Sequence, residues 1–165
     1  MPNPKLPISP SIIIIFMEVL SICASVFIFI YTIRFYIKAP DIVPTHFGIN
    51  GQPDSWGSKN MLFIISGIAT VLYLFLTIMS KKPHLFNYPV IITEENAKRQ
   101  YKLAIEFLSI IKFSVIVLFL MILNKILSAI AGELPISILL PLPVLFSLFV
   151  VFAVIIYIIW ARKIK

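Results

Sequence analysis

The sequence predicts an all-α, polytopic integral membrane protein with four transmembrane helices and one ordered extracytoplasmic loop. Two observations predict this class. Of the 165 residues, 60% are hydrophobic and 13% are charged, whereas soluble domains are about half apolar and about a quarter charged. The chain also contains four apolar segments of roughly the 20 residues that a helix needs to cross about 30 Å of hydrocarbon. A single cysteine excludes an internal disulfide framework.

The four predicted spans are residues 12–33, 61–79, 103–126 and 138–160. Around them, in a single membrane domain 1–165, we expect a flexible Pro-rich tail at 1–11, an outer loop at 39–60 and a cytoplasmic loop at 80–102. The first span is longer than the apolar part of a signal peptide, so it is expected to be a retained helix. Pro141 and Pro143, next to Pro135, predict a kinked or irregular start to the fourth span.

The distribution of Lys and Arg predicts the orientation. Nine of them flank the spans on the side that holds both termini and the 80–102 loop, against four on the other side. The positive-inside rule therefore places both termini in the cytoplasm of a multi-pass cell-membrane protein. The net charge of the chain is +7. Its basic residues lie next to the apolar spans, where we expect them to contact anionic lipid. We expect the lipid bilayer as a partner and no nucleic acid, because no basic patch interleaved with aromatic residues lies outside the spans.

The outer loop holds the most chemistry: His46 to Ser58, closed by Lys59, contains a His, an Asp, a Trp and three Gly. Asn50-Gly51 predicts a two-residue hairpin turn. That turn would pair residue 49 with 52, 47 with 54 and 46 with 55. It would place Asp54 on the opposite face from His46, although Pro53 interrupts the ladder and could change this.

The loop has two interpretations. His46 and Asp54 are ligand types for a divalent metal, but no second cluster of His or Cys supports them. The favoured interpretation is structural, with no metal and no cofactor. Here Gly48, Gly51 and Gly57 permit tight turns, Asp54 caps a turn or the next helix, Trp56 anchors at the interface, and Lys59 contacts headgroups. Ser55, Ser58 and Cys23 lack the glycine elbow or nearby His of a nucleophile, so no catalytic residue is assigned.

The cytoplasmic loop ends in a helix start. Thr93 is a good N-cap, and Glu94 and Glu95 complement the dipole of the first turn. We therefore predict one helix from near Glu94 through the third span, about 50 Å long. The favoured interpretation of residues 87–101 is a capped, solvated helix start whose acidic and amide side chains pair locally with Lys98 and Arg99.

Charges inside the spans are costly and are expected to be paired or functional. Glu18 lies about 9 Å into the first span and Lys112 about 13 Å into the third, both from the cytoplasmic side. We predict that they pair. Glu106 lies one turn inside the membrane, where Lys102 could serve it. The alternative is a proton or ion relay through Glu18, Lys112 and Glu106.

Two blocks resemble a known family. The first is Pro44-x-His46-Phe47-x3-Gly51-x-Pro53-Asp54-x-Trp56-Gly57-Ser58-Lys59, and the second is Asn87-Tyr88-Pro89-Val90, Thr93-Glu94-Glu95-Asn96-Ala97 and Gln100-Tyr101. Together they resemble bacterial domain-of-unknown-function family 1648 over about residues 40–120. That module also occurs in immunity proteins that resemble the one protecting cells from the sporulation-delay toxin. The resemblance implies a membrane module without an assigned activity.

These observations favour a non-catalytic cell-envelope protein of the sensor or toxin-immunity type, with the outer loop as its recognition surface. This interpretation implies another membrane protein or an extracytoplasmic peptide as partner. One alternative is a metal-dependent membrane hydrolase that uses His46 and Asp54. The other is a small transporter or channel unit.

Overall fold

The computed structural model describes residues 3–48, 50–132 and 142–164. It contains four long helices, one short 3-10 helix and a two-stranded antiparallel hairpin. The elements are α1 (Ile12–Tyr36), β1 (Ile42–Phe47), β2 (Pro53–Ser58), α2 (Met61–Ser80), η1 (Pro83–Leu85), α3 (Glu94–Ile130) and α4 (Leu142–Lys163). All four long helices are apolar and long enough to cross a membrane. The predicted fold class is confirmed.

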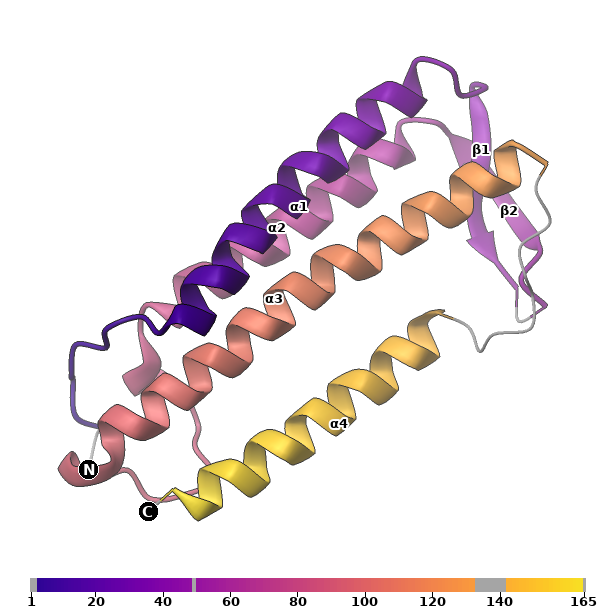
Figure 1. Cartoon of the computed structure of the whole chain (residues 1–165). Helices are drawn as coiled ribbons and strands as arrows, with labels where there is room; N and C mark the ends of the chain where they lie inside the picture. Colours follow the sequence, from indigo (N-terminus) through magenta and orange to yellow (C-terminus); the bar gives the residue numbers. More distant parts are fainter. Residues whose placement is uncertain (1–2, 49, 133–141, 165) are drawn as a thin grey trace.

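The helices run side by side, with the hairpin at one end of the bundle and both termini at the other (Figure 1). We call these the hairpin end and the termini end. Helices α1, α2 and α3 pack on one another, and α4 lies along the termini half of α3. The hairpin is the connection between α1 and α2, and β1 contacts the far part of α3.

Helix α3 begins where its cap predicts. The Thr93 hydroxyl accepts from Asn96 N–H (3.3 Å), and the Asn96 side chain accepts from Thr93 N–H (3.0 Å), which completes a capping box. Its 37 residues extend about 55 Å, well beyond the hydrocarbon core. The helix continues past the predicted end of the span at residue 126 to Ile130, so it reaches the hairpin.

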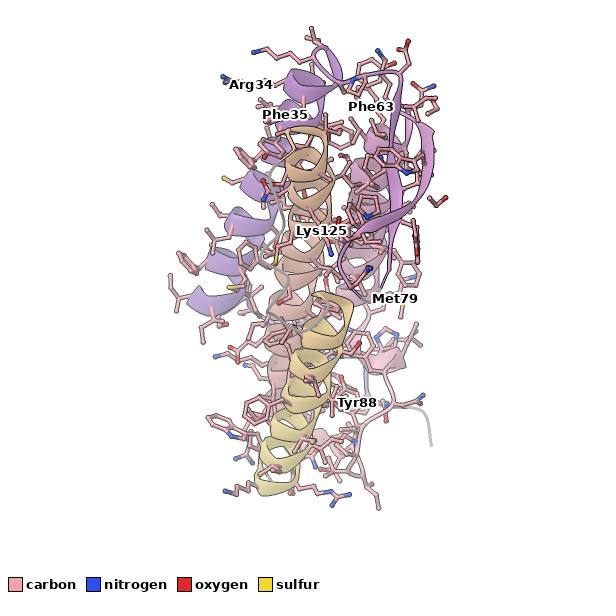
Figure 2. All side chains as sticks on the ribbon, turned by 90° about the vertical axis from the view of Figure 1, so that its right-hand side faces the viewer. Arg34, Phe35, Phe63, Met79, Tyr88 and Lys125 are labelled. Atoms are coloured by element: carbon pink, nitrogen blue, oxygen red, sulfur yellow. The ribbon has the colours of Figure 1, made fainter. Side chains whose placement is uncertain are left out.

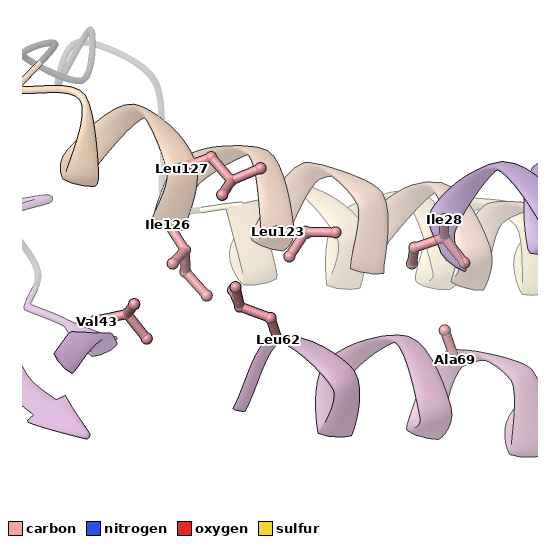
Figure 3. Packing of buried hydrophobic residues seen from close by; sticks show 7 residues of the cluster. All are labelled: Ile28, Val43, Leu62, Ala69, Leu123, Ile126 and Leu127. Carbon is pink, nitrogen blue, oxygen red and sulfur yellow. The ribbon is translucent and has the colours of Figure 1, made fainter. Parts of the chain in front are cut away.

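An apolar cluster joins the helices to the hairpin (Figure 3). Leu62 of α2, Leu123 and Ile126 of α3, and Val43 of β1 are almost completely buried within it. Figure 3 shows these side chains converging from the two helices and the strand. The hairpin is therefore packed against the bundle on one side, and its position relative to the helices is set by the same residues that join α2 to α3.

Polar contacts also join the helices within their apolar segments. Thr32 Oγ1 of α1 lies 2.5 Å from Ser66 Oγ of α2, and both side chains are buried. Each hydroxyl also lies within hydrogen-bond distance of a carbonyl four residues earlier in its own helix, Thr32 of Ile28 O (2.8 Å) and Ser66 of Leu62 O (3.1 Å). One hydroxyl therefore donates to the other, which donates to its own helix carbonyl. Such contacts stabilise packing in lipid, where helix association gains little from the hydrophobic effect.

The proline-rich regions at the two ends of the chain differ in what the structure describes. Pro143 is the second residue of α4, a position where a helix tolerates proline. The irregular start predicted from Pro135 and Pro141 lies outside the described residues. In the tail, residues 3–11 have no regular structure, as their prolines predict. The tail predicted as flexible nevertheless makes contacts: Asn3 Nδ2 donates to His84 O (3.1 Å).

Candidate functional site

The hairpin turn is one residue longer than the Asn50-Gly51 pattern predicts. Gly48 N–H donates to Gln52 O (2.9 Å), and Gly51 N–H donates to Gly48 O (2.9 Å). Gly51 has a φ of 78°, the left-handed conformation that glycine supplies at least cost. The closing pair is thus Gly48 with Gln52; residue 49, the predicted partner of Gln52, lies outside the described residues. A loop of this length with glycine at its last position is a common hairpin form.

This turn changes the register of the strands. Phe47 pairs with Pro53 instead of Asp54, Pro44 pairs with Trp56, and Val43 pairs with Gly57. The predicted pairing of His46 with Ser55 is confirmed, but the register shifts on both sides of it. Gly57 does not serve a turn as predicted. Its role is close approach, since a Cβ there would lie 2.9 Å from Thr45 Cγ2.

The register brings His46 and Asp54 together. His46 Nδ1 lies 2.5 Å from Asp54 Oδ1, so the prediction that they occupy opposite faces was wrong. The reason is the longer turn, because shifting a strand by one residue moves its side chains to the other face. Asp54 therefore caps no helix. Helix α2 has Asn60 at its N-cap, without a side-chain cap bond.

The pair leaves one imidazole nitrogen available for chemistry. A carboxylate only accepts, so Nδ1 is the donor and Nε2 of the neutral ring is an acceptor. Both side chains are more than half exposed. Among the described residues, no three His, Cys, Asp or Glu side chains are grouped closely enough to hold a metal ion. The hairpin thus offers part of a ligand set.

No serine of the hairpin is bonded to this imidazole. Ser55 Oγ accepts from Thr45 Oγ1 (3.3 Å), and Ser58 Oγ accepts from Asn60 N–H (3.3 Å). A nucleophile would need its hydroxyl within hydrogen-bond reach of the base. Cys23 lies in α1, away from the hairpin.

Two lysine side chains connect the hairpin to the helices. Lys59 Nζ lies 3.0 Å from Asp41 Oδ1 and 5.0 Å from the centre of the Tyr36 ring. These contacts within the chain accompany the expected headgroup contact of Lys59, which stays a prediction. Lys125 Nζ of α3 lies 4.7 Å from the centre of the Phe47 ring, and Figure 2 shows Lys125 beside the hairpin. Such cation–π contacts add to the apolar anchoring.

The two strands differ in exposure. On β1, Val43 and Pro44 are fully buried. On β2, Asp54, Ser55, Trp56 and Ser58 are all exposed, and Trp56 keeps 58% of its surface accessible. Among the described residues, no backbone group of β2 bonds to any segment other than β1. The hairpin therefore presents β2, with its outer edge unpaired, on a base held by β1.

The charges within the helices form a second cluster. Lys112 of α3 is completely buried and forms the predicted ion pair with Glu18 of α1. Two side chains of α2 join them: Tyr73 OH donates to Glu18 Oε2 (3.1 Å), and Lys112 Nζ lies 3.5 Å from Thr77 Oγ1. Glu106 forms no ion pair with Lys102 or with this cluster in the described part of the chain. The cluster connects three helices, and the relay through Glu106 stays an untested alternative.

The block at residues 87–101 forms the termini end. Tyr88 OH donates to Pro83 O (2.9 Å), its ring lies 5.5 Å from that of Tyr101, and Tyr101 OH donates to Pro4 O (2.8 Å). Burial raises the pKa of Tyr88, with smaller effects from Tyr157 and Tyr101. Figure 2 shows Tyr88 toward the end opposite the hairpin. Asn87, Tyr88, Thr93 and Glu94 line a pocket of about 690 Å³ beside the tail. Pro89 adjoins this group in sequence.

Sequence reasoning did not predict several contacts that the structure shows in these sites. Asp41 and Lys125 brace the hairpin, Tyr73 and Thr77 complete the buried cluster, and Gln100 binds the end of α4. Tyr73 and Thr77 are four residues apart on α2, so a polar face on that helix was an available signal. The partners of the other three residues are distant in sequence.

Comparison with known proteins supports the family resemblance. Residues 23–70 match the family described as Domain of unknown function (DUF1648). This range contains the whole hairpin and parts of the adjoining helices, so the resemblance is confirmed there. The block at 87–101 lies outside the matched range, although we expected the resemblance to extend to about residue 120.

An archaeal relative shares part of the chain. An uncharacterized protein of Archaeoglobus fulgidus is 32% identical over 62 residues. The match covers 38% of this chain and 34% of the relative, so the chain spans about a third of the length of the relative that it matches. No solved structure matches the chain. The toxin-immunity resemblance finds no support in these matches and stays a prediction.

Proposed function

We propose that the protein is a non-catalytic cell-envelope protein of the sensor or toxin-immunity type, and that its hairpin binds an extended peptide. The observation that carries the proposal is the contrast between the two strands. β1 buries Val43 and Pro44 against the bundle, while β2 has no buried residue and exposes Trp56 and an unpaired outer edge. An extended peptide can add to such an edge through main-chain hydrogen bonds, with side-chain contacts supplying specificity.

The hairpin suits recognition because it is held in place before a ligand arrives. Val43 and Pro44 are buried, and Lys59 and Lys125 contact rings of α1 and β1. A surface fixed in advance loses less conformational entropy on binding. Trp56 supplies the kind of large aromatic contact that dominates many interfaces.

The proposed orientation places this surface outside the cell. Nine Lys and Arg flank the helices at the termini end, against four at the hairpin end. In that orientation the ligand is an extracytoplasmic peptide, such as a toxin or a segment of another envelope protein. The resemblance to a module of immunity proteins supports the same assignment.

The test is selection of peptides from a displayed random library on the full chain in lipid nanodiscs, followed by affinity measurement. Trp56→Ala should weaken the selected peptides by about tenfold or more, as expected for an aromatic anchor. The matched control is Trp160→Ala, because Trp160 is equally exposed but lies at the termini end. Equal effects of the two substitutions, or peptides that bind without regard to either, would argue against a hairpin site.

One observation favours a second candidate, the metal-dependent hydrolase. His46 and Asp54 meet, and a carboxylate on Nδ1 is the usual support for a histidine that binds metal through Nε2. This candidate requires further ligands beyond the two residues. Elemental analysis of the purified protein distinguishes it: near-stoichiometric zinc or a similar ion, lost on substituting either residue, would favour the hydrolase.

A further inference from the structure

A pocket of about 490 Å³ lies where the start of α3 meets the end of α4. Two arginines from different helices line it, Arg99 of α3 and Arg162 of α4, together with Thr93 and Glu95. The apolar side chains of Val90 and Ile91 complete part of its wall. This pocket is at the opposite end of the bundle from the hairpin, so it is separate from the proposed recognition surface.

The two arginines are held near each other by a buried amide. Gln100, next to Arg99, is completely buried, and its Nε2 donates to Ala161 O and Ile164 O, at 2.7 Å in each case. These carbonyls lie on either side of Arg162 in sequence. The Gln100 side chain therefore joins α3 to the end of α4, and this contact sets the positions of the two arginine backbones relative to each other.

The depth of the two arginines matches the headgroup layer. Arg99 precedes the apolar segment at 103 by four residues, about 6 Å of helix, and Arg162 follows Trp160 by two residues, about 3 Å. The headgroup layer of a bilayer adds about 5–7 Å to each side of the hydrocarbon core. Trp160, two residues before Arg162, is exposed, as aromatic residues at the membrane interface are.

The geometry points to a binding site for the phosphate of an anionic phospholipid whose headgroup carries hydroxyls, such as phosphatidylglycerol. Guanidinium groups form paired hydrogen bonds with phosphate oxygens. The carboxylate of Glu95 would repel a headgroup that carries a second phosphate. It can, however, accept hydrogen bonds from headgroup hydroxyls. Basic pockets between transmembrane helices are a recurring form of headgroup site.

The test uses the full chain in a nonionic detergent, with phosphatidylglycerol or phosphatidylcholine added and bound lipid counted by native mass spectrometry. Phosphatidylglycerol should bind about tenfold more tightly than phosphatidylcholine. The double substitution Arg99→Gln and Arg162→Gln should remove that preference. The matched control is Lys98→Gln with Lys163→Gln, which lowers the charge equally at neighbouring positions outside the pocket and should preserve the preference.

Three results would overturn the proposal. Equal loss in the lysine control would assign binding to general surface charge. Displacement of the lipid by an equal concentration of inorganic phosphate would assign the site to a soluble anion. Absence of a preference for phosphatidylglycerol would show that the pocket is not a site for anionic phospholipid. An unchanged melting temperature in both double variants is the check that the fold is intact.

Discussion

His46 and Asp54 face each other across the hairpin, with 2.5 Å between Nδ1 and Oδ1. The contact follows from a turn in which Gly48 pairs with Gln52. Both side chains remain largely exposed, so solvent screens their interaction, and exposed ion pairs contribute at most about 1 kcal/mol. The pair therefore orients the imidazole more than it stabilises the hairpin.

Replacing His46 tests whether this orientation serves structure or metal binding. In the structural account, His46→Gln should lower the free energy of unfolding by less than about 1 kcal/mol, because an amide can replace the donor of a neutral imidazole. Metal content should be the same before and after the substitution. Elemental analysis with thermal melting checks both expectations, and metal that disappears with either His46→Gln or Asp54→Asn would contradict them.

The buried pair of Glu18 and Lys112 should behave very differently from the exposed one. Removing one partner of a buried pair leaves an uncompensated charge and typically costs about 3–5 kcal/mol, while replacing both can be nearly neutral. Glu18→Gln or Lys112→Met alone should lower the detergent melting temperature strongly. The double variant should recover much of the loss.

Glu106→Gln is the matched control for this cycle. Glu106 lies on the same helix as Lys112 but forms no ion pair in the described part of the chain, so its loss should matter little. Additive effects of Glu18→Gln and Lys112→Met would show that the two residues do not interact.

The orientation predicts which end of the bundle a reagent outside the cell can reach. In a Cys23→Ser background, Ser55→Cys on the exposed face of β2 should react with a membrane-impermeant thiol reagent in intact cells. Lys163→Cys at the termini end is the matched position and should react only after permeabilisation. The reverse pattern would invert the proposed topology.

The sequence was sufficient to predict the features that depend on local or additive signals. Apolar length located the four helices, and the Thr93 N-cap with the acidic residues after it located the start of α3. The pairing of Glu18 with Lys112 followed from depth alone, because rise per residue converts sequence position into position across the membrane. Apolar length and the helix cap are local in the sequence, and depth depends only on position along the membrane normal.

The features that sequence reasoning got wrong or missed depend on single-residue geometry or distant contacts. One residue of turn length decided whether Asp54 would face His46. Lys59 contacts Asp41 and the Tyr36 ring because the hairpin folds back on α1. Gln100 and its acceptor Ala161 are 61 residues apart, and no periodicity predicts which carbonyl a buried amide will reach.

Backbone hydrogen exchange tests the proposed hairpin site most directly. A peptide selected on the full chain is added at saturating concentration, and exchange is followed by mass spectrometry. If the peptide adds to the outer edge of β2, amides within Ser55–Ser58 should exchange more slowly, because new main-chain bonds protect them. Amides of α4 should be unchanged. Protection confined to the helices or to the termini end, with β2 exchanging as in the free protein, would contradict the assignment of the hairpin as a recognition surface.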